Sequence, residues 1–274
     1  MPTYLKIFLA SLLSKVLIFF IGKNQKKKIN NVFFNLDISE GIDLRLFLNF
    51  LEEKNLYKSL NKILETDKNY NFVDVGANIG SVSLHLANVY KKSKIYAIEP
   101  SYFAFKKLKS NLSINKMLKK RVKLFNLSIS SSTKKNNYSY ASWKLNFDNK
   151  SHPIHKGILK KTATTKSSLN KFLKKLKKVD FIKIDTDGNE FSILSSGINE
   201  IKKQKPIIHI EFAPYLHEEN GFSTVRLINL IEKNLNYKFL SEKLVKVNNM
   251  KKYASKIGHS SENFFIVHKN FILK

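Results

Sequence analysis

The chain has 274 residues, of which 43% are apolar and 12% aromatic, so it can bury a full core and does not belong to the disordered class. It contains no cysteine, which excludes disulfides and thiolate metal sites and favours a cytoplasmic protein. The formal net charge is +28, and nearly all of the positive charge is carried by lysine.

The lysine bias weakens the usual link between positive charge and nucleic acid. Arginine occurs only at Arg45, Arg121 and Arg226. Lysine lacks the planar fork with which arginine binds phosphate or guanine through two hydrogen bonds. The chain is also rich in asparagine and isoleucine, a bias that an AT-rich genome produces at tolerant surface positions. We therefore discount the charge as a sign of nucleic-acid binding.

An apolar segment from Tyr4 to Gly22 is followed by a lysine-rich run. A helix is predicted here, but Lys15 in its middle makes it marginal for a membrane span, which needs about 20 apolar residues. Two interpretations stay open. Residues 4–28 can lie on the inner face of the cell membrane, held by lysines against anionic lipid, or the helix can pack on the domain or a partner.

Residues 1–31, which contain the apolar helix and the lysine-rich run, are predicted to be separate from a single domain over residues 32–274. Its first part, residues 32–66, is predicted to form a cap over the site. The cap consists of a short strand, Val32 to Leu36, and an amphipathic helix at about Leu44 to Leu64.

A strand, a tight turn and a helix N-terminus are predicted over residues 71–89. Phe72 to Val75 is a short β-rich run, after which apolar residues recur at helical spacing. The turn carries Gly76 and Gly80, while Asn78 stands where dinucleotide-binding turns have a third glycine. Such a turn directs backbone N–H groups and a helix dipole at a ligand. It predicts a nucleotide-type site in which the missing glycine weakens phosphate binding.

The second strand, Lys94 to Ile98, ends in Glu99, at about the distance downstream at which an acidic residue usually meets a ribose. Pro100 follows, so the strand stops with the carboxylate at its tip. A third strand is predicted from Arg121 to Ile129, ending near Ser128.

Residues 130–178 are predicted to form a hairpin inserted between the third and fourth strands. Aromatic side chains recur in it at roughly alternating positions, namely Tyr138, Tyr140, Trp143 and Phe147. They can stack on a sugar or base, or pack on the sheet. His152 and His155 lack a third ligand at metal-type spacing, so no metal site is expected.

Acidic residues mark the ends of the fourth and fifth strands, Val179 to Ile184 and Ile207 to Phe212. The fourth strand is nearly all apolar and is therefore expected to be buried on both faces. Three carboxylates follow it within six residues, those of Asp185, Asp187 and Glu190. Ligands of open α/β sheets bind beyond the carboxyl ends of the strands, so Asp185 is the first catalytic candidate. Two interpretations of Glu190 stay open: it takes part in catalysis, or it only complements the dipole of the helix that it begins.

Glu211 is expected to project into the same crevice as Asp74, Glu99 and Asp185, because all four acids lie near the carboxyl ends of strands. His209 alternates with Glu211, so both side chains face one side of the sheet. This geometry suits a proton relay, with an ordinary core histidine as the alternative.

The chain after the fifth strand is predicted to form a helix at about Thr224 to Asn234 and two last strands, Lys238 to Glu242 and Phe264 to His268. These strands close the sheet with one antiparallel edge strand. The sequence thus predicts an α/β fold of seven strands with helices on both faces.

Four motifs follow one another along the chain: VDVGANIG at residues 73–80, AIEP at 97–100, FIKIDTDGNE at 181–190 and IIHIEF at 207–212. Together they resemble the FkbM-type group of S-adenosylmethionine-dependent methyltransferases, over roughly Val32 to Val267. Asp187 stands where the family pattern has a glutamate. The resemblance implies a Rossmann-like class I methyltransferase fold, with a mostly parallel sheet, and S-adenosyl-L-methionine as the cofactor.

The resemblance also implies roles for single residues. The turn from Gly76 to Gly80 would wrap the methionine end of the cofactor, Glu99 would accept both ribose hydroxyls, and Ser128 would lie beside the adenine. The full set of expected cofactor contacts is Asp74, Gly76, Asn78, Gly80, Glu99, Ser128 and Asp185.

The implied activity is O-methylation of a hydroxyl on a sugar, a glycan or another small metabolite. Asp185 is the expected general base, with His209 or His217 as alternatives and Glu211 as its neighbour in the catalytic set. Two other functions stay open. One is an RNA methyltransferase or basic RNA-binding module, and the other is a non-catalytic, membrane-associated module that keeps the fold.

Overall fold

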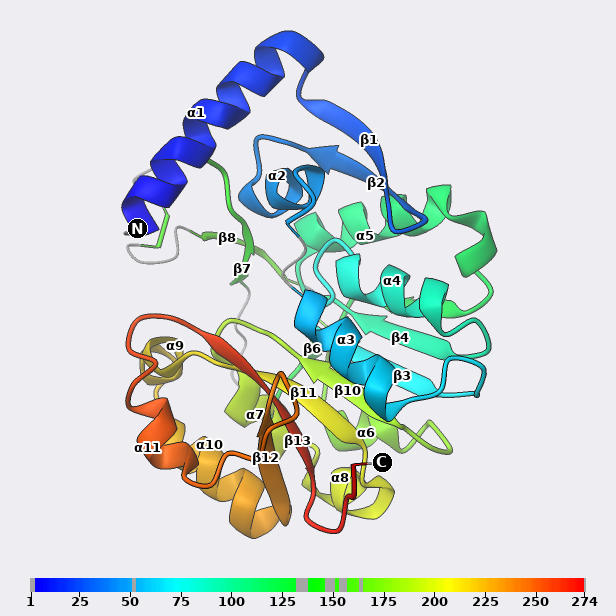
Figure 1. Cartoon of the computed structure of the whole chain (residues 1–274), viewed down its shortest axis with the longest axis vertical. Helices are drawn as coiled ribbons and strands as arrows, with labels where there is room; N and C mark the ends of the chain where they lie inside the picture. The colour runs from blue at the N-terminus through cyan, green and yellow to red at the C-terminus, as the bar shows by residue number, and fades with distance from the viewer. Residues whose placement is uncertain are drawn as a thin grey trace.

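The structure, a computed structural model, describes residues 3–50, 53–131, 138–145, 151–152, 157–162 and 165–273. Its centre is a seven-stranded sheet in the order β12-β13-β11-β10-β3-β4-β5 (Figure 1). The strands are β3 (Asn71–Val75), β4 (Lys94–Ile98), β5 (Val122–Phe125), β10 (Phe181–Ile184), β11 (Ile207–Phe212), β12 (Tyr237–Ser241) and β13 (Glu262–His268).

The predicted α/β fold with a seven-stranded, mostly parallel sheet is confirmed. The strands β11, β10, β3, β4 and β5 run parallel to one another. β13 runs antiparallel to both of its neighbours, β11 and β12. The reversed strand therefore lies next to the edge strand β12 rather than at the edge itself.

Helices cover both faces of the sheet (Figure 1). One face packs against α3, α4 and α5 together with the hairpin of β1 and β2, and the other against α6, α7, α8 and α10. The helices are α1 (Thr3–Ile21), α2 (Gly41–Phe47), α3 (Lys54–Ile63), α4 (Ser81–Val89), α5 (Tyr102–Ile114), α6 (Leu169–Leu173), α7 (Glu190–Ser195), α8 (Ile198–Gln204), α9 (Pro214–Glu219), α10 (Thr224–Asn229) and α11 (Met250–Ala254). A 3₁₀ turn (Lys116–Leu118) and a π-helical turn (Leu230–Asn234) extend α5 and α10.

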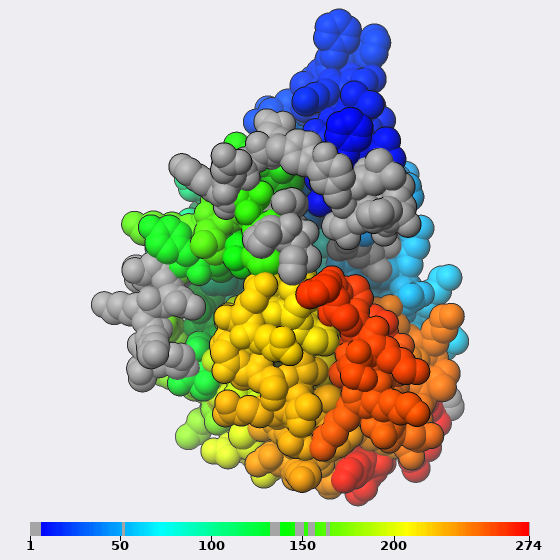
Figure 2. All heavy atoms as spheres, turned by 90° about the vertical axis from the view of Figure 1, so that its left-hand side faces the viewer, coloured from blue at the N-terminus to red at the C-terminus, as the bar shows by residue number. Residues whose placement is uncertain are grey.

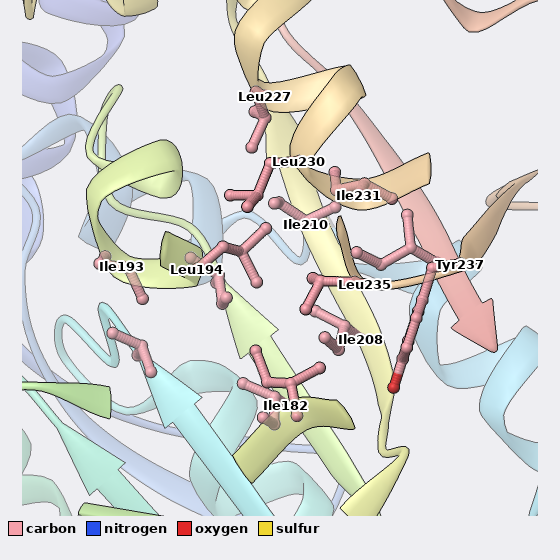
Figure 3. Close-up of a cluster of buried hydrophobic side chains, with 14 of the residues drawn as sticks. Ile182, Ile193, Leu194, Ile208, Ile210, Leu227, Leu230, Ile231, Leu235 and Tyr237 are labelled. Carbon is pink, nitrogen blue, oxygen red and sulfur yellow. The ribbon is translucent and has the colours of Figure 1, made fainter. Parts of the chain in front are cut away.

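The core beneath α10 shows how the parallel strands are buried. Figure 3 shows Leu227, Leu230 and Ile231 in one buried cluster with Ile208 and Ile210 of β11. Each buried side chain of this size contributes about 1.5–3 kcal/mol relative to an exposed one. Because the opposite face of β11 is covered too, the strand must be apolar on both faces, as its sequence predicts.

Smaller strands lie outside the central sheet, in three pairs. They are β1 (Asn24–Ile29) with β2 (Val32–Asp37), β6 (Ser128–Ile129) with β9 (Lys166–Ser167), and β7 (Tyr138–Ser142) with β8 (Ile158–Lys161). The first pair crosses the predicted boundary at residue 31. The third pair is an antiparallel hairpin within residues 130–178, of which Phe147 and His155 lie outside the described residues.

Two of the predicted elements are wrong in extent. The single helix predicted at about residues 44–64 is two helices, because Asn49, which follows the C-cap residue Leu48 of α2, adopts a left-handed conformation with φ of 64°. The third strand ends at Phe125 rather than near Ser128. The side chain of Asn126 there donates to the carbonyls of Glu99 and Pro100, at 2.9 and 3.1 Å, and the chain leaves the sheet.

Candidate active site

The turn between β3 and α4 packs directly on the end of β10. Gly76 and Gly80 have φ values of 85° and 89°, which L side chains rarely adopt. A Cβ atom at Gly76 would lie 1.9 Å from the carbonyl oxygen of Asp185, and one at Gly80 would lie 2.5 Å from Leu108 Cδ1. The glycines therefore bring the turn against the strand that carries Asp185 and against α5.

The backbone N–H groups of this turn are used inside the protein. Gly76 and Ala77 both donate to the carbonyl of Ile98 at 3.0 Å, and Asn78 donates to Glu99 Oε2 at 2.8 Å. The prediction that the turn directs these donors at a ligand is therefore wrong for all three groups. A pyrophosphate at this turn would therefore lack these three donors.

Glu99 joins the two turns that border the site. Its Oε1 atom accepts a hydrogen bond from the Ser101 N–H at 2.8 Å, opposite the bond from Asn78. Burial raises the pKa of this carboxyl to about 7, although the N–H groups of Ser101 and Asn78 act against the shift. A carboxylate has about four lone-pair sites, so two remain for further donors. The adjacent hydroxyls of a ribose are donors of the kind that this buried acid needs.

Asp74 lies beneath the turn rather than at its surface. Its side chain is buried, and Oδ2 accepts a hydrogen bond from Ser83 Oγ at 2.6 Å. Burial raises the pKa of this carboxyl, and Lys183 and Ser83 partly offset the shift. Asp74 thus supports the turn from below, and its predicted contact with a cofactor stays a prediction.

Lys183 is the main residue of this region that the sequence analysis missed. It pairs in register with Asp74 on β3 and His209 on β11, and its Nζ donates to Asp185 Oδ2 at 2.8 Å. Burial acts to lower the pKa of the Lys183 ammonium, but Asp185 and Asp74 outweigh it and raise that pKa. The only signal in the sequence is one charged residue within the apolar run FIKI.

Three carboxyl groups gather at the carboxyl ends of β10 and β11. The Asp185 side chain is 37% exposed, and although burial opposes its ionisation, Lys183 holds its pKa below the ordinary value. Burial raises the pKa of Glu211 well above the ordinary value, and the charges of Asp185 and Asp187 raise it further. The pKa of Asp187 is raised in the same way, by burial and then by Asp185 and Glu190. The site therefore combines one readily ionised acid with two acids that keep their protons to higher pH.

The two histidines considered as bases are fully buried. His209 pairs in register with Lys183, and its Nε2 lies 3.2 Å from Glu242 Oε1. Burial lowers the pKa of His209. His217 lies between Glu190 Oε2, at 3.3 Å, and the hydroxyl of Thr224. Direct proton transfer from an acceptor to His209 would need an intervening group, so its role in catalysis stays a prediction.

Glu190 holds the loop after β10 in place. Its Oε1 atom accepts hydrogen bonds from the backbone N–H and the hydroxyl of Thr186, both at 2.9 Å, and the side chain is fully buried. Of the two interpretations of Glu190, this arrangement supports a structural one, although through the loop rather than through a helix dipole.

The inserted hairpin borders the acidic cluster. Tyr140 of β7 packs on His152, whose Nε2 lies 2.9 Å from Glu219. Burial raises the pKa of Tyr140, and the charges of Glu219 and Asp187 add to the shift. Tyr140 therefore lies within electrostatic range of Asp187. Ser128 is half-buried in β6, and its predicted contact with adenine stays a prediction.

Among the described residues no group of three or more His, Asp or Glu side chains is arranged to hold a metal ion.

Residues 74–239, more than half of the chain, match the family model described as the Methyltransferase FkbM domain. No curated protein matches the chain in sequence. Among solved structures, the methyltransferase FkbM from Methylobacillus flagellatus KT is similar, with 18% identity, a TM-score of 0.46 and coverage of 74% of this chain and 44% of that chain. The chain thus spans less than half of that protein.

Two other solved structures are similar over most of both chains. M. jannaschii TYW2 in complex with AdoMet shows 16% identity and a TM-score of 0.44, with 89% of this chain and 84% of that chain covered. The METTL16 MTase domain shows 10% identity and a TM-score of 0.47, with 94% and 79% covered.

Proposed function

The chain belongs to the FkbM methyltransferase family, and from that premise we propose that it methylates a hydroxyl of a sugar, a glycan or another small metabolite, using S-adenosyl-L-methionine. The observation that carries the proposal is the acidic cluster of Asp185, Asp187 and Glu211 beside the turn at Gly76. When bound, S-adenosyl-L-methionine supplies an electrophilic methyl group on a positively charged sulfur.

The charge of the cluster favours this pair of ligands. Carboxyl groups stabilise a nearby cation, and a bound cation in turn makes it easier for Asp187 and Glu211 to ionise. The same cluster repels an acceptor that carries phosphate or carboxylate groups close to the reacting atom. A neutral hydroxyl is therefore a better acceptor than a group flanked by the phosphates of a nucleic acid.

Asp185 and Glu211 form a pair of unequal acids that can take the hydroxyl proton. Lys183 keeps Asp185 ionised, while burial and the charge of Asp185 keep the proton on Glu211 to higher pH. While Glu211 is protonated, a further proton can bind only to Asp185, whose lowered pKa makes it a weak base. Once Glu211 ionises, the pair accepts a proton with the higher affinity of Glu211, and it becomes the stronger base.

The remaining contribution of the chain is positioning. The turn at Gly76 and the carboxylate of Glu99 fix the cofactor side of the site, and Tyr140 borders the acceptor side. Holding two reactants in line contributes several kcal/mol, with an upper range of about 7–11 kcal/mol for ideal geometry. Because a sulfonium methyl is already reactive, positioning and proton removal suffice for the chemistry.

Small-molecule extracts of cells with and without the chain test the proposal, with mass spectrometry used to find species that differ by one methyl group. We expect the unmethylated species to accumulate without the chain, and also in cells that carry Asp185→Asn. Identical extracts, or full restoration by Asp185→Asn, would contradict an O-methyltransferase and favour the non-catalytic module. A difference confined to RNA nucleosides would replace the acceptor class proposed here.

A further inference from the structure

Most of the large apolar side chains of helix α1 lie on the side that faces away from the domain, while Leu17 and Ile18 pack against the domain. The side chains that face the domain include small and polar ones, Ala10, Ser11 and Ser14, and Ser14 Oγ donates to the carbonyl of Ile38 at 2.8 Å. The exposed apolar residues are Phe8, Leu9, Leu12, Leu13, Val16, Phe19, Phe20 and Ile21. A helix on the surface of a protein in water normally has the opposite arrangement.

These exposed apolar side chains are adjacent to one another on the surface of one helix. Phe19 is 83% exposed and Phe20 is 76% exposed. Figure 2 shows the helix, in blue, projecting beyond the rest of the molecule. Contiguous apolar surface of this kind marks a site of contact with an apolar partner.

The shape of the apolar face fits a lipid surface better than a second helix. At 100° per residue, the exposed positions from Phe8 to Phe20 span an arc of about 140°. A seam between two paired helices is narrower, because it uses only two positions in each heptad. Lys15 projects just beyond one edge of the arc, where a lysine can extend its amine to lipid headgroups while its stem stays in the apolar layer.

Further positive charge follows the helix directly. Lys26 and Lys28 are exposed on β1, with their amines 5.3 and 5.7 Å from the ring centre of Phe33, itself 36% exposed. Neither these two lysines nor Lys15 forms an ion pair within the described part of the chain. Basic side chains next to an apolar helix are attracted by anionic lipid, at about 1 kcal/mol for each charge near the surface.

We propose that α1 is a docking helix that lies in the headgroup region of an anionic membrane surface, with Phe19 and Phe20 among the acyl chains and Lys15, Lys26 and Lys28 against lipid phosphates. None of the described helices is long and apolar enough to cross a bilayer, which fits a helix that lies along the surface. The proposal does not depend on the reaction catalysed.

Docking through α1 would also orient the catalytic domain. Helix α1 binds the segment at Ile38, and Glu40 in turn accepts hydrogen bonds from Ser142 and from the N–H of Trp143. These residues belong to β7 and its continuation, in the insert that also carries Tyr140. The bilayer would therefore lie across α1 from the segment at Ile38 and from the insert that Glu40 holds.

Flotation of the full chain with vesicles tests the proposal, using phosphatidylcholine alone or phosphatidylcholine with phosphatidylserine. We expect the chain to float with the anionic vesicles, and binding to fall several-fold without phosphatidylserine or at high salt. Phe19→Glu with Phe20→Glu should reduce binding at least about tenfold. Val225→Glu with Val245→Glu adds the same charge at exposed apolar positions away from α1 and β1, and should leave binding within about twofold.

Three results would overturn the proposal. The unaltered chain could fail to float with either kind of vesicle. The two double variants could lose binding equally, in which case net charge alone is responsible. Sedimentation equilibrium could show a dimer that Phe19→Glu with Phe20→Glu returns to the 31.7 kDa monomer, which would assign the face to a second copy. Circular dichroism of both variants verifies that they fold.

Discussion

Replacing Lys183 by methionine keeps the length of the side chain and removes a buried positive charge. The amine lies between Asp185, at 2.8 Å, and Asp74, and only 4% of the side chain is exposed. Removing one partner of a buried pair costs about 3–5 kcal/mol. Asp185 is 37% exposed and water can solvate it, so we expect the lower end of this range, about 3 kcal/mol.

Lys178→Met is the matched control, because Lys178 pairs with Asp180 at 2.7 Å but is 72% exposed. An ion pair whose lysine is exposed to solvent in this way is worth at most about 1 kcal/mol. The assay is urea unfolding of both variants and the parent chain, across a range of pH. In the parent, the lowered pKa of Asp185 gives stability that is present above its unfolded value and is lost as the pH falls.

In Lys183→Met, Asp185 and Asp74 have no cation, so their pKa values rise and protonation relieves the unpaired charge. The loss of stability relative to the parent should therefore shrink as the pH is lowered from about 8 to about 4. Equal losses in Lys183→Met and Lys178→Met, or a loss that does not change with pH, would refute the role assigned to Lys183.

Two further predictions concern the turn and the base. Gly76→Ala should lower the free energy of unfolding by at least about 3 kcal/mol, because the new Cβ would meet the Asp185 carbonyl and φ is positive. Gly221→Ala, with φ of 83° but nothing within 4 Å, should cost only about 1 kcal/mol in the same thermal unfolding series. The logarithm of kcat/KM should rise with pH through the raised pKa of Glu211, and Glu211→Gln should abolish that rise and lower the rate. An unchanged pH profile in Glu211→Gln would contradict the paired base.

The central strands could be predicted because burial on both faces leaves a signal in the sequence itself. β10 and β11 are nearly continuous apolar runs, and each is followed or ended by an acid. β1 has no such signal, since NQKKKI is polar except for its last residue. Its strand conformation comes from pairing with β2, where Lys27 lies opposite Phe34 and Lys28 opposite Phe33.

The candidate site could be predicted as a location but not as a network of contacts. The strand ends bring Asp185 and Glu211 together, as the sequence indicates. The partner of Asp185 is Lys183, and its effect depends on Asp74 in a strand far away in the sequence. The N–H groups of the turn could not be assigned either, because their acceptor is the end of β4 and only the register of β3 with β4 reveals it.

Calorimetric titration with S-adenosyl-L-methionine tests the account most directly, using the unaltered chain, Glu99→Ala and Glu65→Ala. The unaltered chain should bind at one saturable site. Glu99→Ala should weaken binding at least about tenfold, because each charge-assisted hydrogen bond to a ribose hydroxyl contributes about 1.5–3 kcal/mol. Glu65→Ala, at an exposed acid that pairs with Lys68, should leave the affinity unchanged. Equal affinity of all three chains, with Glu99→Ala folded, would contradict the account.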